Sequence, residues 1–175
     1  IESNKFNPNS FGYPIHGYIG TTNQIKGWDK NWIKCFINFR IEPQLELLEK
    51  DFLAIDIKNK LKTKIASELD EHEPFNSLVH GDLWSGNIGV NQINKGVIFD
   101  PACWWADCEV DIAMTRLFGN FGSEFYKNYY KIVPMKKGFE KRIVIYNFYH
   151  ILNHANMFGG SYYDQVQSYI KNILN

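Results

Sequence analysis

The segment from Phe139 to Asn156 is the feature that most constrains the fold. Its apolar side chains are spread around the whole circumference of the helix that their spacing predicts, rather than along one stripe: Ile143, Val144, Tyr146, Phe148, Ile151 and Leu152. A helix that is apolar on nearly every side has to be covered on every side. We therefore expect this helix at the centre of the core, ending at Gly159-Gly160.

Further helical patterns flank this segment on both sides. Pro43 can open a helix at its first turn, and Asp107 can cap another. The run that ends at Pro74 should stop a helix before it. Residues 1–27 carry several Gly and Pro without regular apolar repeats and are predicted to be loop. The spacing of apolar residues predicts helices over or near residues 30–40, 43–52, 57–69, 107–118, 121–130 and 162–174.

Three short β-prone runs stand in the middle of these helices, at residues 78–80, 88–90 and 97–99. The last two are separated by the turn signal Asn94-Lys95-Gly96, so they predict a hairpin that ends at Asp100-Pro101. The sequence as a whole predicts an α+β, mainly helical domain with one small β-hairpin inserted near its middle.

Composition excludes several classes of protein. The chain has 175 residues, of which 45% are hydrophobic, which suffices for one domain. Its 19 basic and 19 acidic residues balance, so nothing points to nucleic acid as a partner, and no apolar run approaches the roughly 20 residues of a membrane span. Three cysteines, an odd number, favour a reduced, cytoplasmic protein. The chain starts at Ile1, so an upstream targeting signal is not excluded.

The predicted hairpin brings three polar residues to one end. Asp82 follows the first β-prone run, Asn87 precedes the second strand, and Asp100 closes the third. Oxygen ligands of this kind suit Mg²⁺, and the spacing D-x-x-x-x-N followed by a later Asp is typical of kinase-type phosphotransferases. There the first Asp accepts a proton from the substrate hydroxyl, and the Asn and second Asp hold the metal. The alternative is structural: a capping Asp, a turn Asn and an Asp-Pro turn.

These residues also carry a family resemblance. The segments LVHGDLWSGN (residues 78–87), VIFDPACWWADCEVDIAM (97–114) and GFEKRIVIYNFYHILNHANMFGGSY (138–162) resemble the fructosamine kinase (ketosamine kinase) family, within the aminoglycoside and choline phosphotransferase branch of the kinase-like fold. The likeness runs from Phe11 to Leu174. It implies transfer of the γ-phosphate of ATP, with Mg²⁺, to the 3-hydroxyl of a ketosamine on a glycated amine or protein, which leads to deglycation.

The resemblance also implies roles for single residues. Asp82 would be the base, Asn87 and Asp100 the metal ligands, His80 a brace for the loop, and Trp84 and His154 the substrate-binding residues. Trp84 could instead be a core residue and His154 a satisfied helical histidine.

Other polar residues leave two interpretations open. Glu109 and Asp111 could hydrogen-bond the catalytic loop, or could serve only as acids at a helix N-terminus. His150 and His154 stand four apart but lack the H-E-x-x-H pattern of a zinc site. Cys103 and Cys108 are expected to be core thiols.

A complete kinase-like enzyme also needs a Gly-rich loop and a Lys–Glu pair. Gly17-Tyr18-Ile19-Gly20 has too few glycines for that loop. We therefore expect residues 1–175 to form the C-terminal lobe alone, with an N-terminal nucleotide-binding lobe of the same polypeptide upstream, and we expect this piece by itself to bind ATP poorly and to be inactive. The rival interpretations are a phosphotransferase for an aminoglycoside or choline-like substrate, a non-catalytic kinase-like binding domain, and a helical interaction module.

Overall fold

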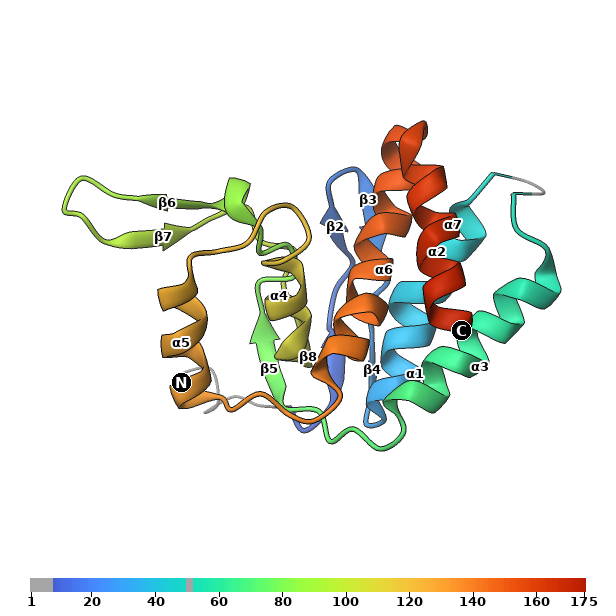
Figure 1. Ribbon diagram of the computed structural model, residues 1–175, viewed down its shortest axis with the longest axis horizontal. Helices are drawn as coiled ribbons and strands as arrows, with labels where there is room; N and C mark the ends of the chain where they lie inside the picture. Colours follow the sequence, from blue (N-terminus) through green and yellow to red (C-terminus); the bar gives the residue numbers. More distant parts are fainter. Residues whose placement is uncertain (1–7, 50–51) are drawn as a thin grey trace.

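A computed structural model describes residues 8–49 and 52–175 of the chain. Its centre is the long helix α6 (Phe139–Phe158), as the sequence predicted (Figure 1). Apolar side chains from several sides of α6 are buried, including Tyr146, Phe148 and Ile151. The helices that pack against it are α2 (Glu42–Leu47), α3 (Ile55–Leu69), α4 (Glu109–Met114) and α7 (Ser161–Leu174).

The first helical segment is more irregular than predicted. Helix α1 (Trp32–Phe36) continues into a π-helical turn η2 (Ile37–Ile41) before α2 begins with Pro43 in its first turn. The predicted continuation to Phe52 is wrong, because Leu48 is extended and ends α2. Helix α5 (Ser123–Ile132) lies on the surface and buries none of its residues.

A four-stranded antiparallel sheet was not predicted. Its strand order is β4-β1-β8-β5, built from β4 (Gly27–Asp29), β1 (Phe11–Tyr13), β8 (Trp104–Asp107) and β5 (Asn76–Val79). A separate ribbon pairs β2 (Gly17–Ile19) with β3 (Thr22–Gln24). The loop prediction for residues 1–27 is therefore wrong from Phe11 onward, and its first seven residues lie outside the described part. Strands of three residues are too short to show an alternating pattern, and β1 also pairs with a distant partner, because Gly12 lies opposite Trp105.

The start of helix α4 also differs from the prediction. Asp107 is the last residue of β8, and Cys108 rather than Asp107 occupies the N-cap position of α4, although Asp107 Oδ1 accepts the backbone N–H of Glu109 at 3.5 Å. The Asp107 carboxylate is fully buried, and it accepts hydrogen bonds from the Tyr146 hydroxyl at 2.7 Å and from the Phe75 backbone N–H at 3.2 Å. Sequence spacing alone could not distinguish a cap from a buried acceptor.

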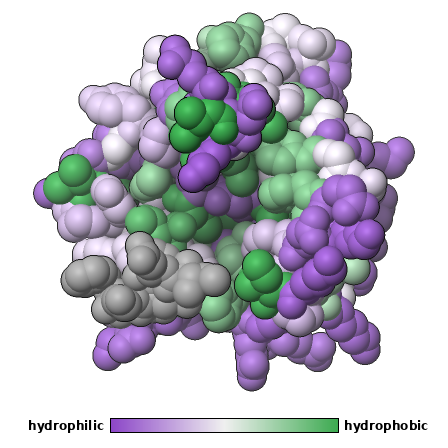
Figure 2. Space-filling model, turned by 90° about the vertical axis from the view of Figure 1, so that its left-hand side faces the viewer, coloured by the Kyte–Doolittle hydropathy of each residue, from purple (hydrophilic) through white to green (hydrophobic). Residues whose placement is uncertain are grey.

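The predicted hairpin is confirmed. Strand β6 (Ile88–Val90) pairs with β7 (Gly96–Ile98), and the ribbon extends away from the body of the molecule (Figure 1). Val90, Ile93 and Ile98 of this hairpin are each more than 60% exposed. On the side of the molecule from which the hairpin projects, the surface is hollowed and the hollow is apolar (Figure 2).

The fold class is confirmed as α+β and mainly helical, with more strands than predicted. No helix within the described ranges is long and apolar enough to cross a membrane.

Candidate active site

His80 holds the loop between β5 and β6 in place through three hydrogen bonds. The backbone N–H of His80 donates to Asp111 Oδ2 at 2.7 Å. Its ring donates from Nε2 to the carbonyl oxygen of Phe99 at 2.9 Å, and Nδ1 accepts the backbone N–H of Asp82 at 3.3 Å. Both ring contacts are satisfied together by the neutral imidazole that carries its proton on Nε2. His80 thus connects the loop that bears Asp82 to the end of the hairpin.

Gly81 occupies a position that only glycine can fill without strain. Its φ is +80°, and a Cβ atom there would lie 2.1 Å from the carbonyl oxygen of Ala102. This close approach lets the Ala102 N–H donate to the His80 carbonyl oxygen at 2.8 Å. The Gly81 N–H donates to Asp111 Oδ1 at 2.9 Å. Burial raises the pKa of Asp111, while the two donated hydrogen bonds oppose that rise.

Asp82 and Asn87 lie against each other, as the sequence spacing predicted. Asn87 is buried, and its side-chain NH₂ donates to the Asp82 carbonyl oxygen at 2.9 Å and to Oδ2 of its carboxylate at 3.1 Å. Burial raises the pKa of Asp82; the Asn87 hydrogen bond and the His80 and His154 rings oppose this, and the charge of Asp100 adds to it.

Asp100 is exposed and has a left-handed backbone conformation, with φ +55°. It follows directly on Phe99, whose N–H donates to the Asn87 carbonyl oxygen at 3.1 Å. Of the three residues that were predicted to converge, Asn87 contacts Asp82 directly, and Asp100 stands at the same end of the hairpin, one residue after the Phe99 that is hydrogen-bonded to Asn87.

Trp84 and His154 line the same cleft as Asp82, which has a volume of about 290 Å³. The indole of Trp84 lies over Gly86, where any Cβ would come within 2.3 Å of the ring. The His154 ring donates from Nδ1 to the His150 carbonyl oxygen at 2.8 Å. The neutral imidazole then offers Nε2 as an acceptor for a hydroxyl group of a bound molecule.

The cleft contains aromatic residues that sequence reasoning missed. Phe118 lies between Trp84 and His154, with ring centroids 6.1 Å and 4.8 Å away. Phe158 and Tyr162, at the corner between α6 and α7, lie 5.6 Å and 5.0 Å from the His154 ring. These residues come from three separate segments, so no local pattern could have grouped them.

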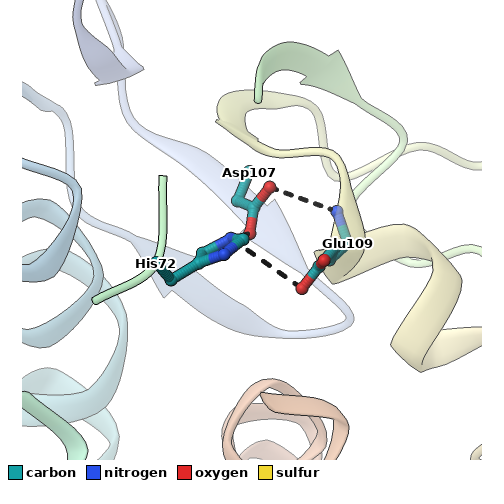
Figure 3. Close-up of side chains that lie close together, drawn as sticks. All are labelled: His72, Asp107 and Glu109. Carbon is teal, nitrogen blue, oxygen red and sulfur yellow. Dashed lines mark hydrogen bonds and ion pairs between the residues drawn. The ribbon is translucent and has the colours of Figure 1, made fainter. Parts of the chain in front are cut away.

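A buried ionic cluster lies where β8 ends and α4 begins (Figure 3). His72 Nε2 is 2.6 Å from Asp107 Oδ2 and 3.8 Å from Glu109 Oε2. Arg142 donates to both Glu109 oxygens, at 2.5 Å and 2.8 Å. Three groups here stand close enough to share an ion, but each carboxylate already has a protein partner. The cluster fixes the first turn of α4, the helix that also carries Asp111.

Asp111 does hydrogen-bond the loop that bears Asp82, whereas Glu109 pairs with Arg142. His150 is fully buried, and burial lowers its pKa to about 3; its carbonyl oxygen holds His154, and the described residues that gather at metal-ligand distance do not include this pair. Cys108 is buried, as expected for a core thiol, but Cys103 is only partly buried.

The fold and the loop define the class to which the chain belongs, that of the kinase-like fold. A crystal structure of a Haemophilus somnus protein assigned as a fructosamine-3-kinase superimposes with a TM-score of 0.86 at 32% identity, covering 96% of this chain and 58% of that one. The sequence model described as fructosamine kinase matches residues 4–175. The chain belongs to the fructosamine kinase family.

Curated relatives agree with this assignment. The chain is 43% identical over 165 residues to a probable ketoamine kinase of Vibrio vulnificus, covering 94% of this chain and 57% of that protein. It is 35% identical over 166 residues to the ketosamine-3-kinase of Mus musculus, covering 93% of this chain and 53% of that one. The chain thus spans little more than half the length of the relatives it matches.

Proposed function

We propose that the protein is an ATP-dependent phosphotransferase that phosphorylates the 3-hydroxyl of ketosamines on glycated amines or proteins and so leads to their deglycation. The observation that carries the proposal is the cleft itself, in which Asp82, Trp84 and His154 share one lining. Membership of the fructosamine kinase family and the names of the relatives support the substrate class.

Asp82 is the proposed base. Its backbone is fixed by His80 and its carboxylate by Asn87, so that the carboxylate is oriented before substrate binds. Taking the proton from the 3-hydroxyl makes the oxygen a better nucleophile, and a general base of this kind contributes about 10²–10⁴ in rate. The raised pKa of Asp82 brings its basicity closer to that of a working base at neutral pH.

Asn87 and Asp100 are the proposed Mg²⁺ ligands. The NH₂ of Asn87 is engaged by Asp82, which leaves its carbonyl oxygen for a cation. The Asp100 carboxylate is exposed, and its charge disfavours ionisation of Asp82, a repulsion that a cation between them would relieve. These oxygen donors fit Mg²⁺. When bound, the ion would neutralise charge on the phosphates of ATP.

Trp84 and His154 are the proposed contacts to the sugar. An indole face suits the C–H side of a sugar, and Nε2 of His154 can accept a hydroxyl hydrogen bond. Asp82 is the one carboxylate among the residues that line this cleft. A polycationic aminoglycoside would call for several, so this lining favours a sugar over that rival substrate.

We further propose that this chain acts as the C-terminal lobe and that a nucleotide-binding lobe of the same polypeptide completes the enzyme. The exposed apolar residues of the hairpin support this, because Val90, Ile93 and Ile98 would be covered by that lobe. The chain alone should therefore bind ATP poorly and turn over little.

The test is ATP consumption by the full-length protein with a glycated lysine analogue, an aminoglycoside and choline, each supplied separately. We expect turnover with the glycated lysine analogue and a loss of about 10²–10⁴ in the Asp82→Asn variant, with ATP still bound. Asp56→Asn, an exposed change on α3, is the matched control and should keep full activity. Turnover with only one of the other substrates, or undiminished activity of Asp82→Asn, would refute the assignment.

A further inference from the structure

The cleft is longer than a sugar alone requires. From Asp82 and Trp84 its lining continues past Phe118 and His154 to Phe158 and Tyr162, where α6 turns into α7. Each ring in this series lies within 6.1 Å of the next, measured between centroids. The aromatic lining is therefore continuous from the proposed base to the edge of the molecule.

The outer end of this aromatic lining is open. Phe158 is 62% exposed although it is a large apolar side chain, and its ring centroid lies 6.1 Å from that of Tyr162. The turn beneath it is set by Gly159 and Gly160, whose φ angles are +61° and +58°. Since two rings at a cleft mouth present apolar surface to water, burying them against a ligand is favourable.

The lining has few charged side chains. It contains no Lys or Arg, and its one carboxylate, Asp82, lies at the inner end. Aromatic faces attract a cationic nitrogen. The outer part of the cleft therefore suits an ammonium group that is followed by an apolar chain, and it offers nothing to a carrier with negative charge close to the nitrogen.

We propose that Phe158 and Tyr162 form a carrier subsite, which binds the aliphatic stem of the amine to which the sugar is attached. The inference rests on the proposed function for its substrate, because the sugar has to occupy the inner end of the cleft beside Asp82 and Trp84. The ammonium nitrogen of the ketosamine then lies over Phe118 and His154.

The experiment measures equilibrium binding to the full-length protein by titration calorimetry, without ATP. The ligands are the ketosamines of one sugar with methylamine, with butylamine and with glycine. For the wild-type protein we expect the butyl compound to bind about tenfold more tightly than the methyl compound, because three methylene groups become partly buried. The glycine compound should bind more weakly than either.

The variant is Phe158→Ala, which alters an exposed side chain and should leave the fold intact. We expect the preference for butyl over methyl to fall to about twofold or less, with the affinity for the methyl compound unchanged. Phe158→Leu should retain most of the preference. Phe75→Ala, a change at another partly exposed phenylalanine that does not line this cleft, is the matched control and should retain all of it.

The outcomes separate this inference from the proposed function. Equal affinity of the wild-type protein for the methyl and butyl compounds, or an equal loss for both in Phe158→Ala, overturns the carrier subsite even if ketosamines are phosphorylated. A chain-length preference that depends on Phe158 supports the subsite even if none of these compounds is phosphorylated. That combination would refute the proposed function and leave the carrier subsite standing.

Discussion

Asp111 hydrogen-bonds the loop that bears Asp82 and is not among the residues that line the cleft, so its replacement tests whether the loop depends on this support. The change is Asp111→Ala, which leaves the backbone N–H groups of His80 and Gly81 without the acceptors that now lie at 2.7 Å and 2.9 Å. A buried donor that loses its acceptor costs about 1–3 kcal/mol, and hydrogen bonds to a charged acceptor lie in the upper part of that range.

Two such donors together would lower the free energy of unfolding by about 2–6 kcal/mol. Part of this cost is offset because the variant no longer buries a carboxylate, whose pKa is raised by that burial. We therefore expect the free energy of unfolding to fall by about 2–4 kcal/mol. Asp111→Asn keeps one acceptor oxygen and should lose about half as much.

The assay is urea unfolding of the chain at pH 7.5, followed by tryptophan fluorescence. Asp56→Ala serves as the control, because Asp56 is exposed and 3.6 Å from Lys60, so its loss should cost about 0.5 kcal/mol or less. In the full-length protein, displacement of the loop by about 1 Å in Asp111→Ala should lower kcat about 100-fold. An unfolding midpoint equal to that of the wild-type chain would refute the claim that these two hydrogen bonds hold the loop.

Three further predictions concern the same region. Replacing Arg142 by Met removes the guanidinium that pairs with the buried Glu109 carboxylate and should lower the free energy of unfolding in urea by about 3–5 kcal/mol. A decrease below about 1 kcal/mol would contradict this expectation. Gly81→Ala should lower the free energy of unfolding, measured by thermal unfolding, by at least about 1–2 kcal/mol, because the φ of Gly81 is +80° and a Cβ there would meet the Ala102 carbonyl oxygen. An unchanged melting temperature would show that the loop can move aside. Asp82→Asn should raise the melting temperature at pH 7.5, because the raised pKa of Asp82 means that its ionisation opposes folding. That advantage should shrink as the pH falls through the raised pKa and disappear below about pH 3, where the carboxyl is protonated in folded and unfolded chains alike. A stabilisation independent of pH would argue against this cause.

The helices could be predicted from the sequence because their pattern is local. The stripe of α3 and the apolar circumference of α6 are repeated over four or more turns, and each repeat strengthens the prediction. The strands β1 and β8 could not, because each has only three or four residues and they pair with each other across 93 positions of chain, Gly12 with Trp105.

The same difference between local and distant contacts decided which residues of the site could be predicted. Asp82, Asn87 and Asp100 could be grouped because a hairpin joins them, and Trp84 because it lies in the same loop. Phe118, Phe158 and Tyr162 reach the cleft only through the packing of α6 against α4 and α7, which no spacing rule reveals.

The role of Asp111 could be predicted only in part. Its position in the first turn of a helix is equally typical of an acid that merely complements the helix dipole. Only the coordinates show its two hydrogen bonds to the loop.

The hairpin β6–β7 is closed at its base by the Phe99–Asn87 and His80–Phe99 hydrogen bonds, and its far end contributes nothing to the polar groups there. The reach of this ribbon can therefore change independently of the reaction centre. Residues added or removed around Asn94 would alter how far the arm extends from the body of the molecule while the spacing of His80, Asn87 and Phe99 at its base stays the same. Evolution can thus adjust the length of this arm without disturbing the polar groups at its base.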